Sequence, residues 1–239
     1  MVECDLAKVD VAGSNPVSRS SSSALRTPMT KRLLLLLLTA WLLTLPVLAQ
    51  TYKLEPISAG APGLPPAYAA LIDTQGYRVL GPSGPWCEIW FRKSIPTAAK
   101  SSDAAIVLPI EQGTLIGVLR FPGEGYDRRG QTVKAGLYTL RYSNYPVDGA
   151  HQGVAPQRDF ALLTPLSADA DPNAKPSFDA LVGASVKGVG NPHPTVLSLE
   201  TPTAASLPSV NKEGDNDWSL SVKVGDLPIA IILVGKAEG

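Results

Sequence analysis

The stretch TLIGVLRFPGEGYDRRGQTVKAGLYTLRY, residues 114–142, decides the fold class of this chain. Two apolar runs, Leu115–Phe121 and Leu137–Tyr142, flank a polar connection that is rich in glycine. In the second run, apolar and polar side chains alternate: Tyr138, Leu140 and Tyr142 against Thr139 and Arg141. A period of two predicts a half-buried strand. We therefore expect a central pair of strands here, against which further strands pack.

Short apolar runs continue on both sides of this pair, separated by clusters of Gly, Pro, Asn and Asp. The further expected strands are Tyr77–Leu80, Trp86–Arg92, Ala104–Leu108, Arg158–Leu163, Thr195–Leu199, Trp218–Val224 and Ile229–Val234. The last is apolar on both faces, which is typical of a strand covered on both sides. Short helices are expected at Ala67–Thr74 and Ser177–Ser185. The pattern predicts an all-β fold: a single β-sandwich, jelly-roll or Ig-like, of about eight or nine strands with one or two short helices.

Residues 29–49, MTKRLLLLLLTAWLLTLPVLA, have the organisation of a secretory signal peptide. Two basic residues precede an apolar run, and Val47 and Ala49 are residues that signal peptidase accepts before a cleavage site. The apolar run Leu33–Ala49 is shorter than the ~20 residues that a membrane span needs. We expect cleavage after Ala49, export by general secretion to the periplasm or the extracellular space, and no stable membrane span afterwards. A retained anchor is the alternative.

The position of this signal divides the chain. Residues 1–28 are interpreted as a mis-called N-terminal extension, residues 50–75 as a Pro/Gly-rich arm with a short helix, and residues 76–239 as the β-sandwich domain. Residues 50–239 carry 16 basic and 18 acidic side chains, a net charge of −2. This balance argues against nucleic acid as a partner. Cys87 is the one cysteine of this region, so no intrachain disulfide is expected.

Two histidines and two nearby carboxylates form the candidate metal site: His151, His193, Asp148 and Asp159. Both histidines lie in expected loops, where functional residues concentrate. No HExxH or comparable spacing supports zinc, and structural or solvated histidines are the alternative. The segment Asp169–Asn173, DADPN, has the spacing that begins a calcium loop but lacks the turn glycine and the final glutamate. An ordinary polar turn is the other interpretation.

Trp86 and Trp90 are the candidate binding residues. In the expected strand they occupy the face opposite Cys87, Ile89 and Phe91. They predict either core filling or an aromatic platform of the kind that stacks on sugars. For Cys87 we favour a buried core thiol over a nucleophile or a copper ligand. Hydrolase and nucleotide-binding motifs are absent from the sequence, and no cofactor is expected.

Three blocks resemble a family of uncharacterised exported bacterial β-sandwich proteins: AGLYTLRY at 135–142, RDFALL at 158–163 and HPTVLSL at 193–199. The resemblance implies a β-sandwich and supplies no activity, cofactor or catalytic residue. We predict an exported, non-catalytic domain that binds an envelope protein or a carbohydrate. The alternative is a metal-binding protein or a metal-assisted enzyme that uses His151, His193 and nearby carboxylates. A purely structural envelope domain is the third hypothesis.

Overall fold

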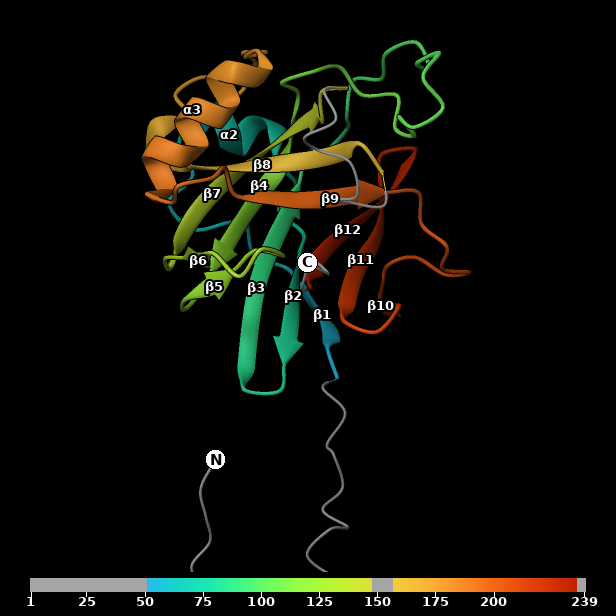
Figure 1. Ribbon diagram of the computed structural model, residues 1–239. Coiled ribbons are helices and arrows are strands. Elements are labelled where there is room, and N and C mark those ends of the chain that lie inside the picture. The colour runs from blue at the N-terminus through green and yellow to red at the C-terminus, as the bar shows by residue number, and fades with distance from the viewer. Residues whose placement is uncertain (1–50, 148–156, 236–239) are drawn as a thin grey trace, which may run out of the picture. The chain divides into compact units, whose positions relative to one another are not determined.

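The computed structural model describes residues 51–147 and 157–235, which fall within one compact unit (Figure 1). Antiparallel strands form one ten-stranded sheet in the order β1-β2-β3-β4-β7-β8-β9-β12-β11-β10, beside a two-stranded ribbon, β5–β6. The strands are β1 Lys53–Ile57, β2 Gly76–Gly81, β3 Gly84–Phe91, β4 Leu115–Phe121, β5 Gly125–Tyr126, β6 Thr132–Val133, β7 Gly136–Asn144, β8 Asp159–Pro165, β9 Val196–Glu200, β10 Ser209–Glu213, β11 Asp217–Val224 and β12 Leu227–Val234.

Helices are few and short. They are α2 Pro66–Leu71, α3 Phe178–Val189 and the 3-10 turn η1 Leu166–Ala168. The predicted all-β class with one or two short helices is therefore confirmed. No helix within the described ranges is both long enough and apolar enough to cross a membrane.

The two layers expected of a sandwich are the two halves of this one sheet. β9 pairs with β8 on one side and with β12 on the other, so the sheet continues from one half into the other. The edge strands β1 and β10 contact each other, and the rings of Tyr52 and Trp218 lie 5.2 Å apart, so the sheet is nearly closed. Side chains from both halves fill the interior, which we call the main core: Ile89, Leu119, Leu140, Leu199, Leu220 and Ile231 are among them.

The central pair forms as predicted. β4 and β7 pair antiparallel, and the β5–β6 ribbon lies in the connection between them. The prediction that β7 is only half-buried is wrong. Tyr138 and Leu140 belong to the main core, and on the other face Thr139 and Arg141 are 0% and 1% exposed. The segment after β8 covers this second face, as described below.

Other differences involve edges and distant partners. Ala104–Leu108 is not a strand, because the N–H groups of Val107 and Leu108 donate to the Asp159 carboxylate, at 2.9 and 3.0 Å. β1 and β10 are strands that the sequence analysis does not predict. β1 contains Pro56, which an edge strand tolerates, and β10 is polar and half-exposed.

A row of opposite charges crosses strands β1 to β4. Glu55, Arg78, Glu88 and Arg120 pair in register along this row. Glu88 is only 5% exposed, and its carboxylate accepts hydrogen bonds from Arg78 (2.8 and 2.9 Å) and Arg120 (2.7 Å). Burial alone would raise the pKa of Glu88, but the hydrogen bonds and charges of the two arginines lower it. The row thus connects the four strands through their side chains as well as their backbones.

Candidate ligand-binding site

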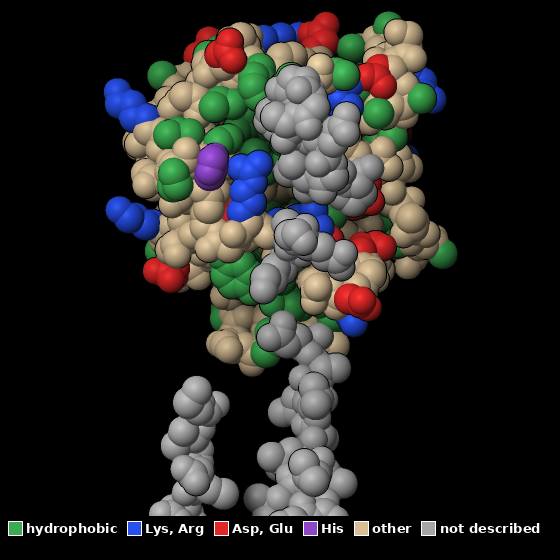
Figure 2. Space-filling model, viewed as in Figure 1, with side chains coloured by type: hydrophobic (Ala, Val, Ile, Leu, Met, Phe, Trp, Pro, Cys, Tyr) green, Lys and Arg blue, Asp and Glu red, His purple; other side chains and the backbone are tan. Residues whose placement is uncertain are grey.

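A pocket of about 350 Å³ lies between α3, strands β8 and β9 and the turn of the β5–β6 ribbon. Its apolar lining consists of Tyr145, Phe160, Phe178, Val182, Pro194 and Val196. Arg129 and His193 complete the lining, and we call these two residues the rim. In the space-filling view a histidine and a basic side chain adjoin hydrophobic surface on this face (Figure 2). Small-molecule sites range from about 300 to 1,000 Å³, so this pocket can hold a small ligand.

Helix α3 supplies one wall of the pocket. Ser177 caps its N-terminus, because the Ser177 Oγ accepts a hydrogen bond from the Ala180 N–H at 3.3 Å, and Gly190 caps its C-terminus in the left-handed conformation, φ 82°. One face of the helix packs inward through Leu181, Ser185 and Val189. Phe178 and Val182, which are four residues apart and so lie on one side of the helix, line the pocket.

The floor of the pocket is aromatic. The rings of Tyr145 and Phe160 lie 4.2 Å apart, and those of Phe160 and Phe178 lie 6.4 Å apart and nearly perpendicular, at 85°. Tyr145 and Phe160 are 5% and 1% exposed, so neighbouring side chains hold both rings in place. Burial raises the pKa of Tyr145 to about 12 against the opposing charges of Arg129 and Arg128, so its phenol is neutral at pH 7.

The turn between β5 and β6 fixes the positions of both rim residues. The Asp127 carboxylate accepts the backbone N–H groups of Arg129 and Gln131, each at 3.0 Å, and the Gln131 side-chain amide at 2.7 Å. Gly130, with φ 75°, supplies the left-handed residue that this turn requires. The Gln131 Oε1 in turn accepts the N–H of His193 at 3.3 Å. The rim is therefore held by hydrogen bonds to main-chain groups.

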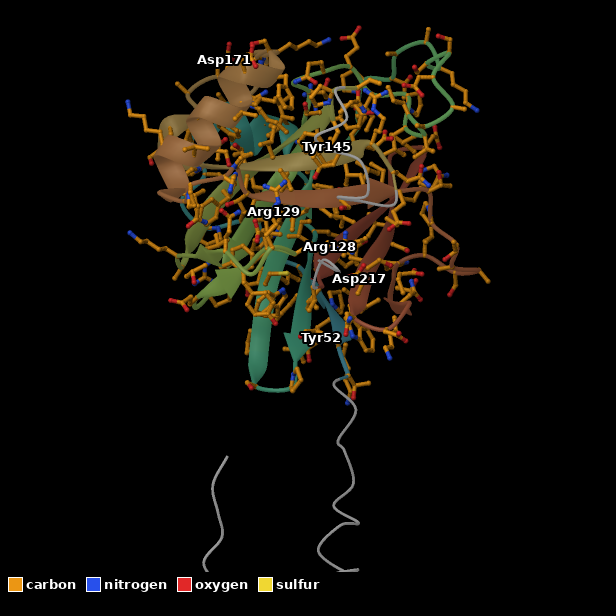
Figure 3. The ribbon with its side chains drawn as sticks, in the orientation of Figure 1. Tyr52, Arg128, Arg129, Tyr145, Asp171 and Asp217 are labelled. Atoms are coloured by element: carbon orange, nitrogen blue, oxygen red, sulfur yellow. The ribbon has the colours of Figure 1, made fainter. Side chains whose placement is uncertain are left out.

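The two arginines of this turn have different surroundings. Arg128 binds Asp217 through Nε and Nη2, at 3.2 and 2.7 Å, and the two side chains are 16% and 15% exposed. Arg129 is exposed, and its guanidinium forms no ion pair with any residue in the described part of the chain. Figure 3 labels both arginines, with Asp217 beside Arg128. Of the two, Arg129 is the cation available to a ligand.

The structure describes two of the four predicted metal ligands, His193 and Asp159. Asp148 and His151 lie outside the described residues. His193 is exposed on the pocket rim. Within residues 51–147 and 157–235, no three His, Cys, Asp or Glu side chains are arranged to hold a metal ion.

The fourth predicted metal ligand, Asp159, is a buried residue whose carboxylate accepts hydrogen bonds from other segments of the chain. It is 0% exposed. Besides the Val107 and Leu108 N–H groups, its carboxylate accepts the Tyr142 hydroxyl at 2.6 Å. Burial, and then the hydrogen bond to Asp159, raise the pKa of Tyr142, so this phenol remains a donor. The carboxylate thus fixes the segment before β4 against β7 and β8, where the sequence analysis expects a strand.

The predicted aromatic platform is wrong, because Trp86 and Trp90 do not share a face. Val79 pairs with Cys87 but Leu80 pairs with Pro85, so Trp86 is an extra residue in β3, a β-bulge. Trp86 packs against the main core and donates its indole N–H to the Leu233 carbonyl at 3.1 Å.

Trp90 lies on the opposite side, in a second apolar cluster with Tyr68 and Ile72. It is 2% exposed, and its N–H donates to the Ala59 carbonyl at 2.9 Å. Core filling, the alternative interpretation of the two tryptophans, therefore describes both. Cys87 is also internal: it is 0% exposed, and burial, then the charge of Glu88, raises the pKa of its thiol.

The acidic segment after β8 binds an internal arginine. Arg141 donates from Nε and Nη2 to the Asp169 carboxylate, at 2.6 and 2.9 Å. Its other N–H groups donate to the carbonyl oxygens of Gly113, Asp171 and Ala174, at 2.8, 2.6 and 2.6 Å. These contacts use all five guanidinium N–H groups. Burial would lower the pKa of Arg141, but the hydrogen bonds and charge of Asp169 raise it.

This arrangement decides between the two interpretations of Asp169–Asn173. The Asp169 carboxylate also accepts the Thr139 hydroxyl, at 2.7 Å, and the Asp171 carbonyl is bound to Arg141. The Asp169 carboxylate, which would be the first ligand of a calcium loop, is thus already bound to two side chains of β7. The segment is a polar turn that covers the outer face of the sheet.

These observations define the described part of the chain as an all-β domain with an aromatic pocket bordered by an arginine and a histidine. Comparisons of the chain with models of protein families, with curated proteins and with solved structures give no match. The resemblance of the three sequence blocks to an exported bacterial family therefore stays a prediction.

Proposed function

We propose that this chain is an exported, non-catalytic domain that binds a small apolar ligand in the pocket between α3, β8 and β9. The pocket itself carries the proposal: a concave aromatic surface with a few polar groups at its edge is the common form of a small-molecule site. The signal-like residues 29–49 support export to the periplasm or the extracellular space.

Binding is favoured over catalysis by the chemistry of the lining. Nucleophilic catalysis requires a nucleophile beside a base, and general acid–base catalysis requires positioned titratable groups. Among the lining residues that the structure describes there is one histidine, His193, and no Ser, Thr, Cys, Asp or Glu. Cys87 and Asp159 are both 0% exposed.

The lining also favours an apolar ligand over the carbohydrate considered in the sequence analysis. Six of the eight lining residues within the described ranges are aromatic or aliphatic, whereas a sugar presents many hydroxyl groups that need hydrogen-bond partners. The sugar-stacking hypothesis depended on Trp86 and Trp90, but Trp90 is buried in the second apolar cluster and Trp86 is half-buried against the main core. Of the two proposed metal ligands that the structure describes, His193 lines the pocket and Asp159 does not, which gives the metal-binding alternative no added support.

The test is binding of Nile red, a neutral apolar dye, to the mature chain and to Val182→Trp. The larger side chain fills the pocket from α3, so we expect dye fluorescence to fall to the level of free dye while the circular dichroism spectrum is unchanged. Val186→Trp is the matched control, because Val186 is on the same helix, is half-buried and does not line the pocket. It should bind dye as the parent does. Equal binding by parent and Val182→Trp would overturn the proposal.

A further inference from the structure

We infer that the ligand of this pocket is an apolar carboxylic acid whose carboxylate binds Arg129. The inference rests on the proposed function and adds the chemical class of the ligand. It depends on three observations: the positive charge at the rim, the hydrogen bonds that fix the turn bearing Arg129, and the lack of an ion pair between Arg129 and any described residue.

The charge at the rim is positive. Among the eight lining residues that belong to the described part of the chain, none is acidic and one is an arginine. The nearest anion on the same turn, Asp127, is 2% exposed and already accepts three N–H groups. A ligand anion that leaves water for an aromatic floor needs a cation beside it, because burying an unpaired charge is costly. The rim provides that cation.

The field of Arg129 reaches the pocket wall. Its charge acts to lower the pKa of Tyr145, against the larger effect of burial. Arg128 acts in the same direction but is bound to Asp217. A carboxylate held over the aromatic floor would therefore lie within the influence of Arg129, the arginine that has no ion pair within the described residues.

A carboxylate fits this cation better than a phosphate. The guanidinium is planar and binds a carboxylate through two parallel hydrogen bonds. A phosphate carries nearly two charges at neutral pH and typically meets several cations or main-chain N–H groups. Here one arginine is paired with a large apolar surface, which matches one negative charge on an apolar body.

The experiment compares phenylbutyrate with phenylbutanol, which have the same apolar body and differ at the charged end. Calorimetric titration of the mature chain should give an affinity for the acid about tenfold higher than for the alcohol, the size of a charge-assisted hydrogen bond. Arg129→Gln should remove this difference by weakening acid binding about tenfold, with alcohol binding unchanged. Arg92→Gln is the control, since Arg92 is a half-exposed arginine outside the pocket lining. It should keep the preference.

Two outcomes separate this inference from the proposed function. If acid and alcohol bind equally well, or Arg129→Gln keeps the preference, the carboxylate inference is wrong, while binding that Val182→Trp abolishes still supports a ligand pocket. If the parent binds neither compound and also fails to bind Nile red, the proposed function itself is wrong. A preference for the acid that disappears in Arg129→Gln and weakens with added salt supports the inference.

Discussion

Replacing Asp169 by Ala should be among the most destabilising single changes at a polar residue of this protein. The substitution removes the carboxylate that pairs with Arg141 at 2.6 and 2.9 Å and leaves a guanidinium that is 1% exposed without a counter-charge. The Thr139 hydroxyl also loses its 2.7 Å partner. Breaking a buried ion pair from one side costs about 3–5 kcal/mol. This is a large part of the roughly 5–15 kcal/mol by which a domain is stable.

Urea unfolding followed by tryptophan fluorescence measures this loss. Arg141→Met/Asp169→Leu removes both charges and should recover most of the stability, since a buried pair replaced by apolar side chains is often neutral. Asp226→Ala is the control: Asp226 pairs with Lys223 at 3.2 Å on the surface, and its loss should leave the midpoint unchanged. If Asp169→Ala and Asp226→Ala unfold at the same urea concentration, the argument for Arg141 is refuted.

Two further changes test the sheet itself. Glu88→Gln should reduce the loss of stability that the protein shows in acid. Burial would raise the pKa of Glu88, but hydrogen bonds from Arg120 and Arg78 lower it. The carboxylate therefore stabilises the folded state fully above the ordinary pKa of about 4.3, and this stabilisation is lost as the pH falls through the lower pKa of the folded state. If the urea midpoints of parent and variant fall by the same amount between pH 7 and pH 3, this prediction is wrong. Gly117→Ala should lower the midpoint of thermal unfolding, because the added Cβ would lie 2.6 Å from a backbone carbonyl oxygen of β3. Gly123→Ala is the control, because its Cβ would have nothing within 4 Å and should leave the midpoint unchanged. Equal midpoints for the two variants would show that the strands separate easily.

The strands that the sequence predicts are those whose signal is local. β4, β7, β11 and β12 carry apolar side chains at a period of two or in unbroken runs, and burial on the inner face follows directly from that period. β1 and β10 lack this signal, because an edge strand needs no apolar face on its outer side. Ala104–Leu108 has a strand-like composition, but its N–H groups bind Asp159, about fifty positions away.

The candidate site is less predictable, because its residues come from separate segments. Arg129, Tyr145, Phe160, Phe178 and His193 become neighbours only when the β5–β6 turn, the ends of β7 and β8, α3 and the segment before β9 assemble. Of these, the sequence analysis singles out His193, as a histidine in a loop, and assigns it to a metal site. The tryptophans show a related limit: one bulge residue in β3 moves Trp86 to the other face, and the alternation of the sequence contains no sign of it.

The arginines together show why Arg129 is proposed as the ligand-binding residue from its position more than from its lack of an ion pair. Arg141 and Arg129 belong to the same stretch of sequence, yet Asp169 and carbonyl oxygens enclose the first, while the turn made by Asp127 presents the second to solvent. Lack of an ion pair alone indicates little, since the half-exposed Arg92 forms none with the described residues either. Arg129 differs because an aromatic floor lies beside it. Under the proposed function, the apolar surface would supply most of the binding free energy, and the charge of Arg129 would supply the specificity.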